Sequence, residues 1–261
     1  MRSLDIAATG LAAQQVNIDT ISQNLANMTT TGFKSERPEF QDLLYQDVKR
    51  VGSNANDQGA IQPVGLEMGL GVKTDAITRD MSSGTMTNTN EPLDMAVQGR
   101  GYFQVELADG TLAYTRDGSF TLSPDGVIVT KDGLTVQPAI TIPPDATSVN
   151  INTSGQVQVT IQGQIDPQQV GQLQMATFVN EGGLQPLGDN MYAETAASSS
   201  PTLNNPGIDG TGTILQGYLE ASNVNPVTQI TNLIVAQRAY EMNTKVLTAS
   251  DQMMQSLNQS A

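Results

Sequence analysis

Apolar residues near the N-terminus recur with the spacing of a helix. Between residues 4 and 28 the chain has no proline and a single glycine. The apolar positions are Leu4, Leu11, Ile18 and Leu25, seven residues apart, with Ile21 among the intermediate ones. This spacing places them in one narrow stripe on an α-helix whose other face is polar. We predict a helix over residues 4–28, ended by a left-handed glycine at Gly32.

The C-terminal segment carries a second apolar stripe. Asn225 followed by Pro226 has the form of an N-cap and a first helical residue, and neither Gly nor Pro follows them. The stripe consists of Ile230, Leu233, Tyr240, Leu247, Met254 and Leu257. Polar residues fall between these positions, so the predicted helix has a partly polar seam.

Both stripes must be covered. The two helices can pair antiparallel, but a single pair leaves much of each stripe exposed, which favours packing against other subunits. Docking of both helices on the chain's own β region is an equally open alternative.

The middle of the chain has a different period. From Gly99 onward apolar and polar residues alternate, and Asp-Gly pairs begin at residues 109, 117, 125 and 132. Asp-Gly between short alternating segments is a strong hairpin signal, so we predict a meander of antiparallel strands and a loop over Ser198–Gly212. The expected strands are Thr111–Arg116, Ser119–Leu122, Val127–Lys131, Leu134–Val136, Ser148–Ile151, Gln156–Ile161, Gly171–Val179 and Asn190–Ala193. The fold class is therefore α+β, with long terminal helices forming a coiled-coil-like layer and a central, mainly antiparallel β region.

Negative charge is concentrated in the middle of the chain. The net charge is −14, of which residues 1–40 carry −1, residues 225–261 carry none and the remainder carries −13. Nearly neutral ends from many copies can bundle with little charge repulsion, while an acidic centre is expected to face solvent and limit unwanted association. A merely soluble acidic middle is the simpler alternative.

Composition excludes several kinds of chemistry. The 261 residues include no Cys and no His, so neither catalysis nor metal ligation by a thiolate or an imidazole is possible, while carboxylate chemistry and an oxygen-ligand Ca²⁺ site stay open. Carboxylate pairs such as Glu91/Asp94 or Asp109/Glu106 could in principle act on sugars, but the chain has no Trp to stack on sugar rings. We expect turn and surface roles for these acids, and no enzyme, cofactor or metal site. Without clustered basic residues or a long apolar run, neither nucleic acid binding nor membrane insertion is expected.

Four segments together resemble the bacterial flagellar rod and hook family. They are Asn24–Lys34, Val97–Phe103, Tyr114–Phe120 and the stretch from Gln216 to Asn225 that continues to Gln237–Glu241. In the first of them the motif residues are Asn24, Asn27, Gly32 and Phe33. The resemblance covers nearly the whole chain, and four motifs in the right order make it specific. The length and the stretch Phe40–Gln46 are most similar to the distal-rod members of the family.

The resemblance implies a structural subunit of the flagellar distal rod. Family members form a helical tube whose inner layer is made of terminal helices, so the stripe residues Leu4, Leu11, Ile18, Ile21, Leu25, Ile230, Leu233, Tyr240, Leu247 and Met254 are expected at subunit interfaces. The implied domains are a helical axial core (1–30 and 226–261), a connecting region (31–95 and 195–225) and an outer β domain (96–194). A proximal-rod or hook subunit is the alternative within the family, and a secreted carbohydrate-binding or -degrading β protein is the alternative outside it.

Partners and location also follow from the resemblance. The chain is expected to polymerise with itself into a straight, rigid, hollow tube that transmits motor torque to the hook. Its other expected partners are proximal-rod proteins, hook or hook-junction proteins, the outer-ring bushing proteins and the flagellar export apparatus. The subunit would reach the basal body, in the periplasm, through the flagellar secretion channel and without a cleaved signal.

A rod-type insertion is expected at about residues 46–65. In this family, such an insertion after the first helix is associated with a straight tube. Its candidate residues are Gln46, Lys49, Arg50, Asp57 and Gly65. The segment is rich in Gly and Asn, so alone it should be flexible, and we predict that neighbouring subunits order it.

Overall fold

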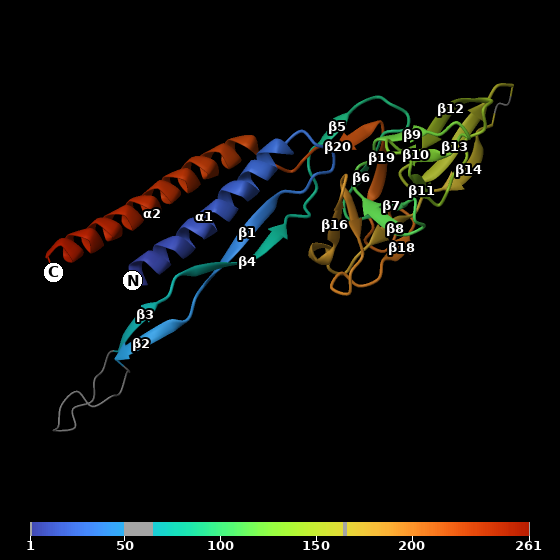
Figure 1. Cartoon of the computed structure of the whole chain (residues 1–261). Coiled ribbons are helices and arrows are strands. Elements are labelled where there is room, and N and C mark those ends of the chain that lie inside the picture. The colour runs from blue at the N-terminus through green and yellow to red at the C-terminus, as the bar shows by residue number, and fades with distance from the viewer. Residues whose placement is uncertain (1, 50–64, 164–165, 261) are drawn as a thin grey trace. The chain divides into compact units, whose positions relative to one another are not determined.

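The computed structural model describes residues 2–49, 65–163 and 166–260 (Figure 1). The chain divides into two compact units. One, here called the helical unit, comprises residues 1–26, 36–78 and 225–261, and the other, the β unit, comprises residues 27–35 and 79–224. The predicted α+β class is confirmed, with a helix at each end of the chain and an antiparallel β region between them.

The helical unit is built on two helices, α1 (Arg2–Ala26) and α2 (Pro226–Ser260). The free ends of both lie at the same end of the pair, so the helices run antiparallel (Figure 1). Asn225 caps α2 as predicted, because its Oδ1 accepts hydrogen bonds from the amides of Val227 (3.1 Å) and Thr228 (3.3 Å). Neither helix has an apolar stretch long enough to cross a membrane, among the residues that the structure describes.

A ribbon of four strands, which the sequence did not predict, completes this unit. Strand β1 (Glu36–Asp42) pairs with β4 (Val72–Arg79), and β2 (Tyr45–Lys49) pairs antiparallel with β3 (Leu66–Gly69). The ribbon is bonded to α1 at two places. The side chain of Asn24 exchanges two hydrogen bonds with the backbone of Glu36 (2.7 and 2.8 Å), and Thr9 Oγ1 accepts one from the amide of Val72 (3.4 Å).

The β unit contains a nine-stranded sheet. Its main path runs β16–β17–β8–β7–β11–β10–β9, and β15 pairs with both β7 and β18. The bounds are β7 (Tyr102–Glu106), β8 (Leu112–Thr115), β9 (Phe120–Leu122), β10 (Ile128–Thr130), β11 (Thr135–Gln137), β15 (Met175–Thr177), β16 (Gln185–Gly188), β17 (Met191–Ala193) and β18 (Thr202–Asn204). The short 3₁₀ turn η1 (Glu181–Gly183) precedes β16.

Smaller sheets accompany it. Strands β12 (Ala146–Ile151), β13 (Gln156–Ile161) and β14 (Gln168–Gln172) form a three-stranded antiparallel sheet. Strand β19 (Thr213–Gln216) pairs with β6 (Met95–Gln98), and β20 (Tyr218–Glu220) pairs with β5 (Met86–Asn88). The C-terminal part of the β unit therefore returns to pair with its first strands.

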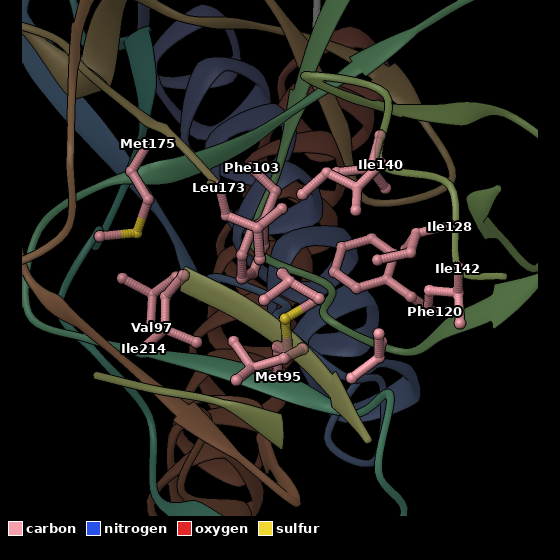
Figure 2. Close-up of a cluster of buried hydrophobic side chains, with 14 residues drawn as sticks. Met95, Val97, Phe103, Phe120, Ile128, Ile140, Ile142, Leu173, Met175 and Ile214 are labelled. Carbon is pink, nitrogen blue, oxygen red and sulfur yellow. The ribbon is translucent and has the colours of Figure 1, made fainter. Parts of the chain in front are cut away.

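The central strands of the large sheet pack against an apolar core on each face. Alternation along β7 sends Phe103 and Val105 to one face and Tyr102 to the other. The first face meets the larger core, which Figure 2 shows: Met95, Val97, Phe103, Phe120, Ile128, Val136, Ile140, Ile142, Ile151, Val157, Val159, Leu173, Met175 and Ile214. The second face meets a smaller core: Tyr102, Tyr114, Ala176, Phe178, Leu184 and Tyr192.

The predicted simple meander is wrong at one of its four Asp-Gly turns. The turns at Asp109, Asp125 and Asp132 join the paired strands β7–β8, β9–β10 and β10–β11, but β8 and β9 do not pair. At Asp117-Gly118 the chain packs against β6 instead, where a Cβ on Gly118 would lie 1.5 Å from the Met95 carbonyl oxygen. Glycine therefore serves a close backbone approach there. The predicted loop 198–212 also contains a strand, β18.

Candidate functional site

The predicted stripes are partly used within the chain. Ile21 is buried, and partly buried stripe residues lie on both helices: Leu4, Leu11, Ile18, Leu25, Leu233, Leu247 and Met254. Small residues complete this face of α2, where Ala236 and Ser250 are buried. The helices approach closely at Gly10, because a Cβ there would lie 3.0 Å from Asn243 Nδ2. Ile230 and Tyr240, by contrast, are 47% and 40% exposed.

Helix α2 carries a second apolar stripe that we did not predict from the sequence. Val235, Met242, Val246 and Met253 follow one another at intervals of seven, four and seven residues, which places them on one helix face. Their exposed fractions are 62%, 60%, 50% and 59%. The spacing could have revealed this face, which we call the outer α2 stripe. Whether the predicted interface residues and this stripe contact other subunits stays a prediction.

The first family motif is divided between the two units. Asn24, whose side chain is almost fully buried, bonds the backbone of Glu36 inside the helical unit. Asn27, Gly32 and Phe33 lie in the β unit, where Asn27 Oδ1 accepts a hydrogen bond from Thr30 Oγ1 (3.1 Å). Gly32 has a positive φ of 68°, but α1 already ends at Ala26, so the predicted glycine cap of the helix is wrong. The open Cα of Gly32 allows contact with the backbone of Arg116 instead.

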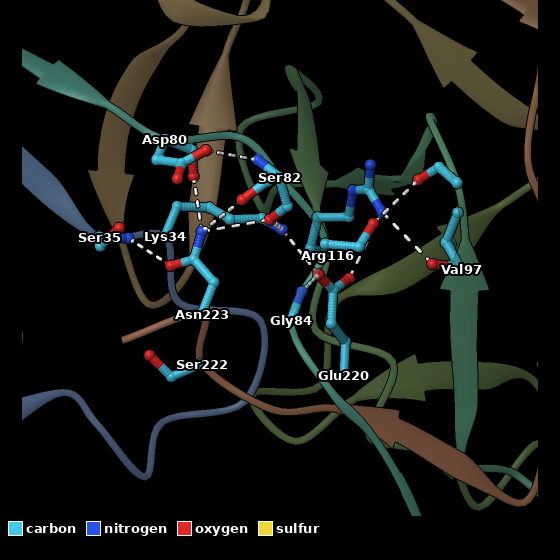
Figure 3. Close-up of polar contacts among 12 residues, drawn as sticks. Lys34, Ser35, Asp80, Ser82, Gly84, Val97, Arg116, Glu220, Ser222 and Asn223 are labelled. Carbon is cyan, nitrogen blue, oxygen red and sulfur yellow. Dashed lines mark hydrogen bonds and ion pairs between the residues drawn. The ribbon is translucent and has the colours of Figure 1, made fainter. Parts of the chain in front are cut away.

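A buried charge cluster lies in the β unit where three motifs meet (Figure 3). It consists of Lys34, Arg116 and Glu220, whose side chains are at most 1% exposed. Lys34 Nζ lies 2.6 Å from Glu220 Oε1, and Arg116 Nη1 lies 3.4 Å from Glu220 Oε2. The amide of Gly84 also donates to Glu220 Oε1 (2.9 Å). One carboxylate therefore serves two cations.

Each cation of this cluster has additional contacts. Lys34 Nζ donates to the Ser82 carbonyl (2.8 Å), and Arg116 Nη1 donates to that of Val97 (3.4 Å). The Arg116 guanidinium lies 4.9 Å from the centre of the Tyr102 ring, a cation–π contact. Burial lowers the pKa of the Lys34 ammonium, and the nearby Glu220 carboxylate opposes that effect only partly.

Asn223 joins its own segment to two others next to this cluster. Its Oδ1 accepts from the Ser35 amide (2.7 Å), and its Nδ2 donates to the carbonyl oxygens of Asp80 (2.9 Å) and Ser82 (3.2 Å). The Asp80 amide donates to the Ser35 carbonyl (2.9 Å), so the two segments that Asn223 joins are also bonded to each other. The family motifs contain Lys34, Arg116, Glu220 and Asn223, but the sequence pattern indicated no role for these four side chains.

The rod-type insertion lies mostly outside the described residues. Gln46 and Lys49 belong to β2, with Gln46 paired to Met68 of β3, and Gly65 precedes β3. Arg50 and Asp57 are not among the residues that the structure describes, so its ordering by neighbours stays a prediction.

The acidic residues considered for chemistry have turn contacts. Asp109 Oδ1 accepts hydrogen bonds from the Thr111 hydroxyl (2.6 Å) and amide (2.9 Å), which lower the pKa of the Asp109 carboxyl. The Asp94 amide donates to the Glu91 carbonyl (3.3 Å). Within residues 2–49, 65–163 and 166–260, no three acidic side chains gather in a way that could hold a metal ion.

Three family models match the chain in order. They describe a flagella basal body rod protein (residues 4–34), the D1 domain of the flagellar hook protein FlgE/F/G (96–159) and the C-terminal part of the flagellar basal body rod FlgEFG protein (215–260). These matches include both helices and the large sheet's first strands.

Curated relatives match over the full length. The flagellar basal-body rod protein FlgG of Caulobacter vibrioides is 54% identical over 99% of both chains, and that of Buchnera aphidicola subsp. Schizaphis graminum is 48% identical over 98% of both. The rod protein FlgF of the same Caulobacter strain is 34% identical over 91% of this chain and 90% of its own.

The chain therefore belongs to the flagellar basal-body rod protein family. Within that family it is a structural subunit of the distal rod, of the FlgG type, and assembles in the flagellar basal body with other flagellar proteins. The prediction drawn from the motifs is confirmed.

Proposed function

We propose that many copies of the helical unit pack side by side into a straight, rigid, hollow tube that transmits motor torque to the hook. The observation that carries the proposal is the outer α2 stripe. The α1–α2 pair covers one face of α2, yet Val235, Met242, Val246 and Met253 remain half or more exposed. A run of large apolar side chains on one helix face is characteristic of a surface that another chain covers.

The same unit supplies further parts of the proposed interface. Ile230 and Tyr240 of the predicted stripe are exposed on α2 and are available to a neighbour. The other predicted residues have partners within the chain and would first hold α1 and α2 together. Together the two sets would give the coiled-coil-like layer expected from the sequence, with residues 1–30 and 226–261 as the axial core and residues 96–194 as the outer domain.

The specific partners and location belong to the same proposal. The subunit would contact proximal-rod proteins at one end of its tube and hook or hook-junction proteins at the other, inside the outer-ring bushing. It would reach the periplasm through the flagellar export apparatus. The proposal assigns the chain a mechanical role and no catalytic step.

Val246→Asp tests the interface. Val246 is 50% exposed, so the substitution should leave the isolated chain folded. At a subunit contact it would lose about 1 kcal/mol of apolar burial and also place an unpaired carboxylate there, at a cost of several kcal/mol per contact. Cells producing this variant should therefore export the protein but assemble few rods, as counted by electron microscopy of purified basal bodies, and they should not swim.

Thr248→Asp is the matched control. Thr248 is also exposed in the middle of α2, two residues away and on a different face, so the same residue is introduced at similar cost to the helix. We expect near-normal rods from this variant. Equal assembly of both variants, or straight tubes from Val246→Asp at wild-type frequency, would contradict the assignment of the stripe.

A further inference from the structure

The chain passes between its two units four times. The passages lie at residues 26/27, 35/36, 78/79 and 224/225. If each connection moved independently, a load on the helical unit would twist the four segments separately. A rod subunit that transmits torque needs connections that deform together, so contacts that couple these connections would help to transmit torque.

Three of the four passages are bonded to one another on the β-unit side. Ser35 precedes the second passage, Asp80 follows the third and Asn223 precedes the fourth. The Asn223 side chain contacts both of the other segments, and the Asp80 amide bonds Ser35 directly. Backbone bonds add to this, because the Gly32 amide donates to the Glu220 carbonyl (2.8 Å) and the Asn223 amide to that of Phe33 (3.4 Å).

The buried charge cluster also holds these segments together. Lys34 is next to Ser35 in sequence, and Glu220 lies three residues before Asn223. Their 2.6 Å ion pair therefore joins the segment before the second passage to the segment before the fourth. Lys34 also donates to the Ser82 carbonyl, on the segment that follows the third passage. Charged hydrogen bonds that are shielded from water are stronger and more directional than exposed ones.

We propose that Asn223 is a positioning residue that locks these three connections together, with the Lys34–Glu220 pair as its buried support. The lock makes the connecting segments deform as one body when torque reaches the subunit. This role rests on the proposed mechanical function, and it requires no contact between the units themselves.

Hydrogen exchange in Asn223→Ala tests the lock in the isolated chain. The variant removes the acceptor of the Ser35 amide and the donor to Asp80 and Ser82 without changing any charge. We expect exchange at the Ser35 and Asp80 amides to accelerate about tenfold or more, while amides of the large sheet, such as that of Val105, stay unchanged. A uniform acceleration across the β unit, or none at Ser35, would overturn the proposal.

Two further variants sharpen the result. Asn223→Asp keeps an oxygen to accept from the Ser35 amide but turns a carboxylate toward the carbonyl oxygens of Asp80 and Ser82. The resulting repulsion should separate residues 80–82 from Ser35, whose carbonyl is the acceptor of the Asp80 amide. Exchange should therefore accelerate at the Asp80 amide and much less at the Ser35 amide. Asn180→Ala is the matched control, because the Asn180 side chain donates to the Ala197 carbonyl (3.1 Å) and both residues are distant in sequence from the four passages. Its Ser35 and Asp80 amides should exchange at the wild-type rate.

The mechanical consequence is measured in assembled rods. Torsional compliance, measured from beads attached to flagellar stubs on locked motors, should rise about twofold in Asn223→Ala and not in Asn180→Ala. Faster exchange with unchanged compliance would refute the mechanical role. Wild-type chains that form no tube in electron micrographs would refute the proposed function instead, so the two failures are distinguishable.

Discussion

The buried charge cluster predicts an unequal response to neutralising its members. Glu220→Gln keeps the shape of the side chain but leaves Lys34 and Arg116 buried without a carboxylate to balance their charges, with the Ser82 and Val97 carbonyls and the Tyr102 ring as remaining contacts. Breaking a buried pair by removing one partner costs about 3–5 kcal/mol, and here a single carboxylate serves two cations. A loss of this size approaches the whole stability of many domains, about 5–15 kcal/mol.

Lys34→Met should be much milder. Glu220 keeps Arg116 at 3.4 Å and the Gly84 amide at 2.9 Å, so the remaining pair is neutral overall. The Ser82 carbonyl loses the ammonium but still accepts from Asn223 Nδ2 at 3.2 Å. The lost hydrogen bonds cost about 1–3 kcal/mol. Part of this cost is offset because the variant no longer buries an ammonium, whose burial is unfavourable and lowers the pKa of Lys34.

Urea unfolding of the full chain measures this difference. The tyrosines of the smaller core report on the β unit through their fluorescence, and the unfolding free energies of the two variants should differ by about 2 kcal/mol. Arg37→Met is the control, because the Arg37–Glu39 pair is 78% and 46% exposed and should contribute less than about 1 kcal/mol. Equal losses for Glu220→Gln and Lys34→Met would refute the reasoning that one anion balances two cations.

The other predictions concern the two cores of the β unit. Phe103→Ala should lower the unfolding free energy by about 3–5 kcal/mol, since Phe103 is fully buried and packs edge-on against Phe120, whereas Leu122→Ala, at a 43% exposed position, should cost much less in the same urea titration. Burial raises the pKa of Tyr102, so the unfolded chain loses the phenol proton at a lower pH than the folded chain does. The free energy of unfolding should therefore fall as pH rises past about 10, by up to about 1.4 kcal/mol per pH unit. Tyr102→Phe should flatten that fall between pH 10 and 12, and an unchanged slope would contradict it.

The helices could be predicted from the sequence because the residues that define a helix are close neighbours along the chain. A seven-residue apolar repeat and the Asn225-Pro226 start are enough to define α1 and α2 within a few residues. Three Asp-Gly turns were correct for the same reason. The fourth failed because Gly118 is selected by the approach of Met95, a residue on another strand.

The ribbon and the charge cluster depend on partners that are distant in sequence. Strands β1 and β4 expose most of their residues, so they show no alternation between apolar and polar faces. Lys34, Arg116 and Glu220 are separated by about a hundred residues each, and a charged residue ordinarily predicts a surface position. Their presence inside family motifs was the available signal, but only the fold shows that they meet.

The open hairpin ends, together with the absence of cysteine, make this subunit suitable for optical study. A Cβ built at Gly110 or Gly133 would meet no atom within 4 Å, so solvent surrounds these bends. One cysteine placed at the exposed Lys131, beside the second of them, would be the sole thiol in the chain. A dye coupled there could follow the rotation of a single shaft in a living cell without disturbing the packed interior.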